Sequence, residues 1–368
     1  MGDKGWRGMR WAASLCLAFG VAGCQTGMDA GVATTFAPAD SLTIPVHHAW
    51  GGEVRCDSGG CRLAVVEHEG NAVALYRLDG SRKSQLLSKA EVAYHPDSVK
   101  WLNDRLVAAT VEATQSIDVF DTQDGKLQLL QQVVVGFAPR DLHVLGMADG
   151  AFSLVVSPYS GDDLLWLKIS EDGRSSPSQV LEPWCRSPRH PVLLPHGMQG
   201  AGAGVAVGCD RDFRVLFRPL GLGTPPQKPA PMERFNNVPR QVIPSPSGRW
   251  LYVVQEQGGR NARIDTRTGR LQWIKAPRWG AVSVAPISDD LVIWGDDEKV
   301  HLQQLDADGR VEAMRWLPTT GFPTQLQLID ADQDGALDLV VYNSAGTGVD
   351  VLYGPLWEKA KPSLTNEK

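Results

Sequence analysis

The chain has 368 residues, of which 43% are hydrophobic, and its 36 basic and 42 acidic side chains give a net charge of −6. Nucleic-acid binding requires a strongly basic face, so this mildly acidic composition excludes nucleic acid as the expected partner. One hydrophobic core rarely grows beyond about 250–300 residues, a limit that rings of small sheets escape because each unit packs only on its neighbours.

The first 23 residues have the pattern of a targeting segment. A short basic start leads into an apolar run from Trp11 to Ala22, which is too short to cross a bilayer as a helix. The run ends Val21-Ala22-Gly23-Cys24, which resembles the lipobox of bacterial lipoproteins. The resemblance implies a signal peptide over residues 1–23 and a lipid on Cys24. An ordinary secretory signal with an unrelated Cys is the alternative, and Met9 is a second possible start.

The lipobox resemblance also implies a location. Gln25 follows the Cys where Asp would favour retention in the inner membrane, so the chain is expected at the bacterial outer membrane. The lipid would hold it there, facing either the periplasm or the exterior. Residues 25–42 are rich in Ala and Thr, also contain Gly, Asp, Ser and Pro, and lack periodicity. With Cys24 they are predicted to form a flexible tether.

A turn ending in Gly recurs along the rest of the chain at intervals of 40 to 48 residues. It falls at Gly80, Gly125, Gly173, Gly221, Gly269, Gly309 and Gly354. Short β-branched or aromatic runs lie between these turns, and no stretch has sustained helical periodicity. A period in the forties with such runs is typical of a β-propeller with four strands per blade. The sequence therefore predicts an all-β chain folded as a propeller of about seven four-stranded blades, give or take one.

The predicted propeller occupies residues 43–358, after the tether at 24–42 and before a C-terminal tail at 359–368. Residues 43–50 are a candidate strand for the last blade, which would close the ring by pairing the two ends of the chain. Four cysteines lie within the propeller. In an exported protein their local pairing favours two disulfides, Cys56–Cys61 and Cys185–Cys209. Zinc binding is the alternative and would need tighter pairs or nearby His ligands.

Most predicted blades begin with Pro followed by a polar residue, and in four of them that residue is Arg. If these positions start the innermost strands, the arginines meet at one mouth of the central funnel and could hold a carboxylate, phosphate or sulfate. The four are Arg140, Arg189, Arg240 and Arg278. The alternative is that each Arg pairs with an acid of the next blade and holds the ring closed. His190 could join His143 or Arg189 in the same funnel.

One loop carries a metal-ligand pattern. Acids occupy positions 1, 3, 5 and 9 around the Gly at position 6 of Asp330-Ala331-Asp332-Gln333-Asp334-Gly335-Ala336-Leu337-Asp338. Several oxygens on a tight loop suit Ca²⁺, but an EF-hand would need flanking helices and a Glu at position 12, where Val341 stands. With strands on both sides, residues 320–354 resemble an FG-GAP or VCBS-type propeller repeat. The resemblance implies calcium held by the side chains of Asp330, Asp332, Asp334 and Asp338 and the carbonyl of Ala336. An Asp-rich turn without metal is the alternative.

No catalytic signature is present in the sequence: it has no Gly-x-Ser-x-Gly elbow, no His-Glu-x-x-His and no phosphate-binding Gly loop. We therefore expect a non-enzymatic module, anchored through Cys24 and stabilised by calcium, that binds a protein or glycan partner. The alternative is a propeller hydrolase or lyase, lactonase-like or polysaccharide-active, with its site in the funnel. Metal held only at the Asp330 loop would favour the first, and metal in the funnel would favour the second.

Overall fold

The computed structural model describes residues 40–175, 180–220, 235–276, 280–297 and 299–357, together with two short strands at 34–35 and 230–231. The predicted signal segment, Cys24, Arg278 and the C-terminal tail lie outside the described residues. Within the described part, strands account for nearly all regular structure, with one 3₁₀ turn at Gln123–Gly125. No described helix is long and apolar enough to cross a bilayer.

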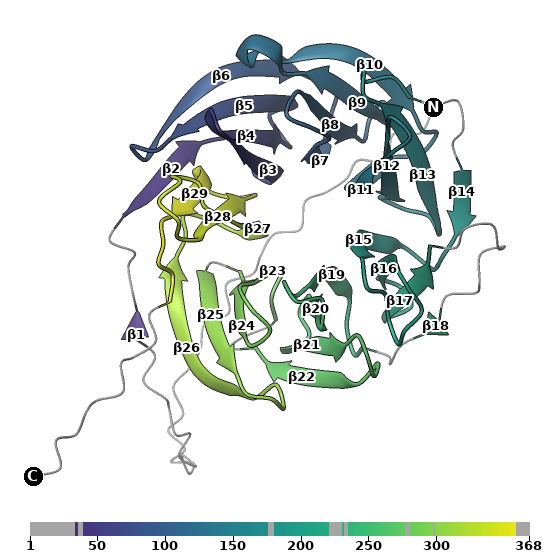
Figure 1. Cartoon of the computed structure of the whole chain (residues 1–368), viewed down its shortest axis with the longest axis vertical. Helices are drawn as coiled ribbons and strands as arrows, with labels where there is room; N and C mark the ends of the chain where they lie inside the picture. The colour runs from purple at the N-terminus through teal and green to yellow at the C-terminus, as the bar shows by residue number, and fades with distance from the viewer. Residues whose placement is uncertain are drawn as a thin grey trace, which may run out of the picture. The chain divides into compact units, whose positions relative to one another are not determined.

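Seven four-stranded antiparallel sheets form the blades of a β-propeller ring (Figure 1). Blades 1 to 4 are, in order, β3 (Ala49–Asp57), β4 (Gly60–Glu67), β5 (Ala72–Asp79) and β6 (Lys83–Glu91); β7 (Pro96–Trp101), β8 (Leu106–Val111), β9 (Ser116–Asp121) and β10 (Gln128–Val134); β11 (Pro139–Ala148), β12 (Ala151–Pro158), β13 (Asp163–Ser170) and β14 (Val180–Pro183); β15 (Pro188–Leu194), β16 (Gly204–Cys209), β17 (Arg214–Pro219) and β18 (Ala230–Pro231). Blades 5 to 7 are β19 (Pro239–Pro244), β20 (Trp250–Gln255), β21 (Arg260–Asp265) and β22 (Leu271–Lys275); β23 (Ser283–Pro286), β24 (Leu291–Gly295), β25 (Lys299–Leu305) and β26 (Val311–Pro318); β27 (Pro323–Ile329), β28 (Asp338–Asn343), β29 (Gly348–Leu352) and β2 (Ser41–Pro45).

The two ends of the chain close the ring. Blade 7 takes its outermost strand from the N-terminal side, since β2 pairs antiparallel with β29 from Ser41↔Leu352 to Pro45↔Gly348. The predicted closure is therefore confirmed, although the strand begins two residues earlier than expected. A short strand, β1 (Thr34–Thr35), pairs in parallel with β26 of blade 6. Part of the predicted tether thus joins the sheets, because edge strands of blades 6 and 7 offer unpaired backbone groups.

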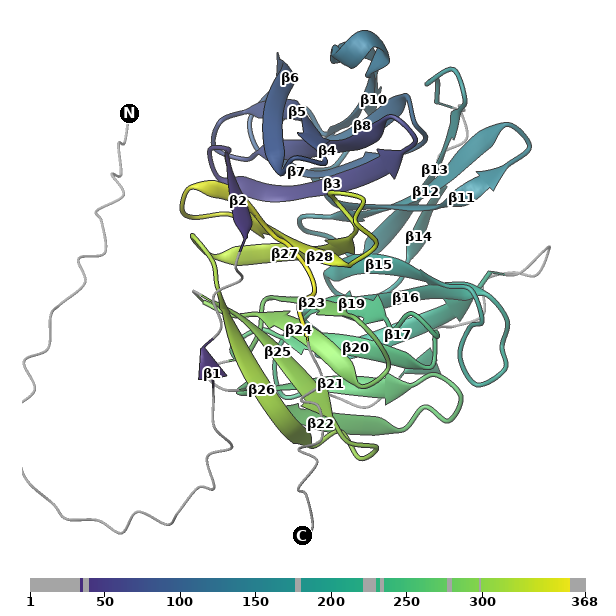
Figure 2. The same ribbon diagram turned by 60° about the vertical axis from the view of Figure 1, so that its left-hand side comes forward.

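Hydrophobic side chains pack in clusters at the seams between adjacent blades. Because side chains alternate across a strand, each blade sends one set of apolar residues to each neighbour. In β4, Leu63 and Val65 pack towards blade 7, whereas Ala64 and Val66 pack towards blade 2. The described residues form seven such clusters, one for each seam. Figure 2 shows the blades stacked side by side around the ring. This explains how so long a chain folds without one large core.

The two sequence signals have distinct places in a blade. In blades 1, 2, 3, 5 and 6 the recurring Gly turn joins the third strand to the fourth. In blade 7 it follows β29, where the chain leaves the sheet, and Gly221 lies outside the described residues. The prolines that were predicted to open blades begin β7, β11, β15, β19 and β27, which are all innermost strands. A Pro suits the first residue of a strand, where no ladder hydrogen bond is lost. Both signals therefore report strand order within the blade.

Candidate functional site

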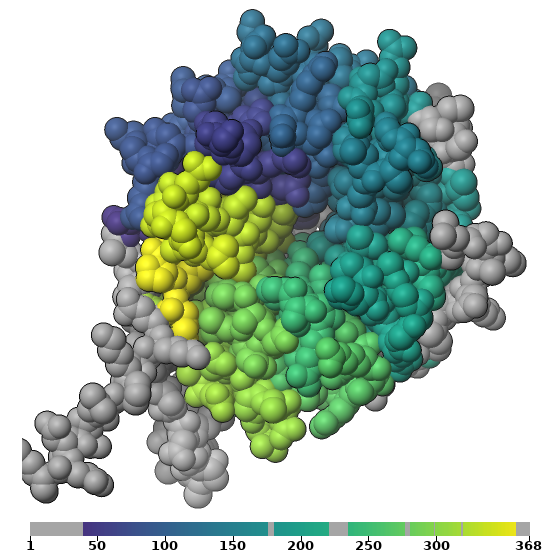
Figure 3. Space-filling view, viewed as in Figure 1, coloured from purple at the N-terminus to yellow at the C-terminus, as the bar shows by residue number. Residues whose placement is uncertain are grey.

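The innermost strands surround a central cavity of about 220 Å³. The space-filling view shows the ring hollowed near its centre (Figure 3). Six of the seven innermost strands carry a bulge close to their start, where the pairing with the second strand skips one or two residues. A bulge re-aims the side chains at the skipped positions. Here those positions supply much of the cavity wall, including Trp50, Asp97, Arg140, Asp141 and His190.

Three predicted arginines line this cavity together, on the adjacent strands β11, β15 and β19. Their charges act on one another, since Arg140 and Arg240 both lower the pKa of Arg189 in addition to the larger effect of its burial. Lys100 of β7 lines the same space. The predicted convergence is therefore present for Arg140, Arg189 and Arg240, whereas Arg278 lies outside the described residues.

The three arginines differ in what they contact. Arg189 Nε lies 2.6 Å from Asp210, and Arg240 lies 2.9 Å from Glu256, each acid following the second strand of the same blade. The alternative of pairing with the next blade is therefore wrong for these two. The equivalent position beside Arg140 is Tyr159, whose ring centroid lies 5.0 Å from the guanidinium carbon. Among the described residues Arg140 has no carboxylate within ion-pair distance, and its charge acts on Asp141 only from farther away. Its guanidinium can therefore donate to a ligand.

Two acids, Asp141 and Asp210, lie beside the cavity arginines and differ in their pKa. Asp141 accepts hydrogen bonds at Oδ2 from Ser157 Oγ at 2.9 Å and from the backbone N–H of His190 at 3.0 Å. Burial raises the pKa of Asp141, but Arg140, His190 and Arg189 outweigh it, and the pKa is lowered. Asp210 differs, because burial raises its pKa to about 6 in spite of Arg189. Near neutral pH, Asp141 is thus charged and Asp210 titrates.

A stack of three aromatic rings begins at the cavity wall in blade 1. Trp50 lines the cavity, and its ring stacks on His68 at 4.8 Å, which in turn stacks on His95 at 4.6 Å. His68 Nδ1 lies 3.1 Å from Asp97, a second cavity residue. Burial lowers the pKa of His68, but the hydrogen bond and charge of Asp97 exceed this effect and the pKa is raised. Sequence reasoning missed this stack, since its rings come from two blades.

The His68–Asp97 pair predicts a pH dependence of stability. Because the folded-state pKa is raised, the pair stabilises the fold fully below the ordinary His pKa of about 6.5 and loses that contribution as the pH rises through the folded value. When the pH is raised from 6 to 8, urea denaturation should show a larger decrease in the free energy of unfolding for wild type than for His68→Gln. Equal losses in the two proteins would contradict the assignment.

The Asp330 loop joins β27 to β28 and is shaped by its own carboxylates. The Asp330 carboxylate accepts hydrogen bonds from the backbone N–H groups of Asp334 at 3.0 Å and Gly335 at 2.9 Å. The buried carboxylate of Asp338 accepts hydrogen bonds from the N–H groups of Ala331 and Gly354. Gly335 has a φ of 91°, which requires Gly at position 6. Ala336 lies at the end of the loop, where its N–H donates to Asp334 Oδ1 at 2.8 Å.

The loop's oxygens fit a hard cation. One oxygen each of Asp330, Asp332 and Asp338 lie within 4.8 Å of one another, and in the described chain this is the one cluster of three such ligands. A residue that the sequence did not single out also contacts the loop. Arg82, in the β5–β6 turn of blade 1, donates from Nε to Asp332 at 2.8 Å, and its NH2 lies 3.5 Å from Asp334. Two of the predicted calcium ligands therefore pair with a cation of the protein.

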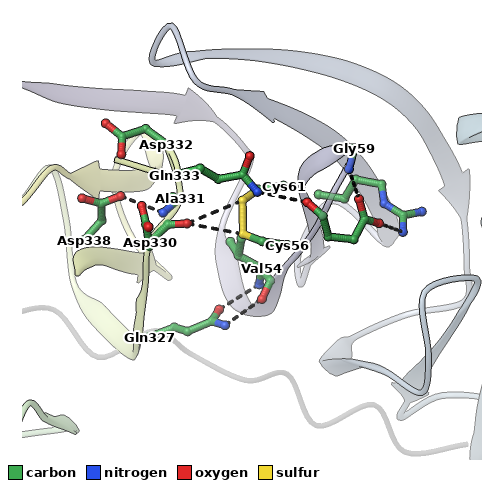
Figure 4. The surroundings of a disulfide bond; sticks show 12 residues. Val54, Cys56, Gly59, Cys61, Gln327, Asp330, Ala331, Asp332, Gln333 and Asp338 are labelled. Carbon is green, nitrogen blue, oxygen red and sulfur yellow. Dashed lines mark hydrogen bonds and ion pairs between the residues drawn. A yellow bond between two sulfur atoms is a disulfide. The ribbon is translucent and has the colours of Figure 1, made fainter. Parts of the chain in front are cut away.

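The loop also contacts a disulfide of blade 1. The structure contains the bonds Cys56–Cys61 and Cys185–Cys209, the two pairs favoured by the sequence. Both sulfurs of the first lie close to the Asp330 carbonyl oxygen, at 3.6 and 3.7 Å (Figure 4). Beside them, the Gln327 side-chain amide accepts a hydrogen bond from the Val54 N–H and donates one to the Val54 C=O, each at 2.8 Å. Disulfide, loop and amide pair therefore meet at the seam between blades 7 and 1.

No protein-family model and no curated protein sequence matches the chain. The resemblance of residues 320–354 to FG-GAP or VCBS repeats therefore stays a prediction. Solved structures do match. Virginiamycin B lyase from Staphylococcus aureus is 11% identical with a TM-score of 0.61, covering 85% of this chain and 98% of that one. The Cps50 (Swd1) propeller domain of Myceliophteria thermophila is 12% identical with a TM-score of 0.60, covering 85% and 99%.

A candidate 6-phosphogluconolactonase from Bacteroides uniformis is similar as well, at 16% identity and a TM-score of 0.58, covering 76% of this chain and 91% of that one. These three proteins are a lyase, a candidate lactonase and a β-propeller domain. At such identities the likeness extends to the fold alone. The chain is a seven-bladed β-propeller.

Proposed function

We propose that this propeller is a binding module whose funnel holds an anionic group of a protein or glycan partner. The observation that carries the proposal is Arg140. It occupies the same blade position as Arg189 and Arg240, but Tyr159 replaces the acid that neutralises each of those two. A guanidinium in a concave site without a carboxylate partner suits a carboxylate, phosphate or sulfate, which it can bind through two parallel hydrogen bonds.

The setting of this module follows from the lipobox resemblance and the Asp330 loop. A lipid on Cys24 would place the propeller at the outer membrane, and the tether would leave one of its faces free to meet the partner. Calcium held by Asp330, Asp332, Asp334, Asp338 and the Ala336 carbonyl would be structural, since the loop lies at a seam between blades and away from the cavity lining.

Binding of sodium sulfate by the purified full-length chain tests the proposal, measured by isothermal titration calorimetry at constant ionic strength. Arg140→Gln should weaken sulfate binding about tenfold or more, because a hydrogen bond to a charged group contributes about 1.5–3 kcal/mol. Arg174→Gln is the matched control, as Arg174 is a highly exposed arginine in a turn of blade 3. Equal affinities in wild type and Arg140→Gln would overturn the funnel assignment.

The second candidate is a hydrolase or lyase, lactonase-like or polysaccharide-active, acting in the same funnel. Two observations favour it. The cavity holds two histidines and the charged Asp141 in addition to its cations, and similar folds include a lyase and a candidate lactonase. Release of products from lactones or acidic polysaccharides by wild type, lost in Asp141→Asn with the fold intact, would decide for the enzyme.

A further inference from the structure

His143 of β11 has its proton fixed by the backbone of the neighbouring blade. The N–H of Leu193 in β15 donates to His143 Nε2 at 3.3 Å. A backbone N–H can only donate, so Nε2 must accept and the neutral ring must carry its proton on Nδ1. His143 lines the central cavity. Among the described residues its Nδ1 has no hydrogen-bond partner. This atom is not sealed from solvent.

His190 is held in the same way but offers nothing to a ligand. The Gln241 side-chain oxygen accepts the N–H of Val284 at 2.8 Å, which leaves its amide nitrogen facing His190 Nε2 at 3.1 Å. His190 Nε2 therefore accepts, and its proton also resides on Nδ1. That atom is sealed from solvent. Of the two funnel histidines, His143 is thus the one with an N–H that a ligand can reach.

The surroundings keep His143 uncharged. Burial lowers its pKa to about 3, and the positive charge of Lys100 and the proximity of His190 act in the same direction. The charged or titratable groups around the two histidines come from the adjacent strands β7, β11, β15 and β19. They are Lys100, Arg140, Asp141, Arg189, His190 and Arg240. Glu53 of β3 also lines the cavity and lies 3.8 Å from Lys100 Nζ. Asp141 stays ionised because its pKa is lowered.

We propose that His143 is a neutral N–H donor to the bound anion, with Arg140 and Lys100 supplying the positive charge. This inference rests on the proposed function. All three groups donate hydrogen bonds, so the ligand class is a fully ionised oxyanion, a carboxylate or a sulfate group, whose oxygens all accept. His143 is unsuited to general-base chemistry on a ligand, because its one lone pair faces Leu193 and not the cavity.

The test uses two substitutions in the full-length chain. His143→Leu removes both ring nitrogens, whereas His143→Asn restores a donor at the Nδ1 position. By calorimetry, His143→Leu should bind sodium sulfate about tenfold more weakly than wild type, and His143→Asn should stay within about threefold. Sodium acetate in a second series shows whether a carboxylate is held in the same way. His47→Asn is the control, since His47 is exposed and does not line the cavity.

The pH profile separates a neutral donor from a charged one. Asp210 titrates near pH 6 and affects wild type and His143→Asn alike, so the informative quantity is the ratio of their sulfate affinities. The ratio should stay constant from pH 6 to pH 9. A ratio that grows as the pH falls would mean that His143 is protonated on binding and would overturn the inference. Long-range ¹H–¹⁵N spectra of the histidine rings should show the proton of His143 on Nδ1, even if His143→Leu fails to fold.

The outcomes distinguish the two proposals. If Arg140→Gln weakens sulfate binding and a folded His143→Leu does not, the anion site stands and the role of His143 is wrong. If wild type binds neither sulfate nor acetate, both proposals fail. A proton found on Nε2 contradicts the role of His143 whatever the affinities.

Discussion

The substitution Ile44→Asp should lower the free energy of unfolding by about 4 kcal/mol or more, enough to unfold many single domains, because it buries an unpaired carboxylate. Ile44 belongs to β2, the strand from the N-terminal side that completes blade 7. Its side chain is fully buried in the cluster between blades 7 and 1. The change therefore disrupts both the last sheet and the seam that closes the ring.

Urea denaturation followed by circular dichroism measures this effect. Ser41→Asp is the matched control, because Ser41 belongs to the same strand but is exposed. The control should change stability by about 0.5 kcal/mol or less, as surface substitutions commonly do. If both variants unfolded at the wild-type urea concentration, β2 would not be an essential part of the ring.

Calcium should stabilise the wild-type chain, and Arg82 should limit how tightly it binds. At a free concentration of about 100 times its dissociation constant, one bound ion adds about 2.7 kcal/mol. Arg82 bonds Asp332 and approaches Asp334, so we expect it to compete with the ion for these carboxylates. We expect Arg82→Gln to melt at a lower temperature than wild type in chelator and to bind calcium severalfold more tightly. In Asp334→Asn, chelator should no longer change the melting temperature.

The matched control is Arg105→Gln, which breaks the Arg105–Asp121 ion pair in blade 2, away from the loop. It should lower stability without changing the affinity for calcium. Equal calcium affinity in wild type and Arg82→Gln would contradict the competition. If calcium changed the melting temperature of neither protein, an Asp-rich turn without metal would be the better description. Calcium titrations monitored by thermal melting and calorimetry distinguish these cases.

Local patterns in the sequence predicted most of the fold, because blades are built from local hairpins. The Gly turns and the initial prolines are properties of a few neighbouring residues, and the structure places them in equivalent positions of successive blades. The same holds for the local disulfide Cys56–Cys61. The two segments that form β1 and the start of β2 were assigned to the tether, since pairing with a distant sheet edge leaves no local signal.

The candidate site was predictable only in part. The arginine row was found because each Arg follows a Pro. What each Arg contacts depends on the residue after the next strand, which is why Tyr159 was not recognised as the exception. Arg82 was missed because it reaches the Asp330 loop from 250 residues away in the chain. The proton position of His143 depends on a backbone N–H of another blade, and no sequence pattern encodes it.

Ring closure by β2 also sets an order of events. Thr43 and Asp350, which are hydrogen-bonded across this junction, are 307 residues apart in the chain. Ribosomes make β2 first and its partner β29 almost last, so the first strand of the propeller waits unpaired throughout synthesis, with Ile44 lacking its seam. Bringing such distant segments together is slow, because the entropy of a long loop must be overcome before any contact forms. Until the final blade closes, β2 and β29 keep unpaired edges, and such edges favour aggregation.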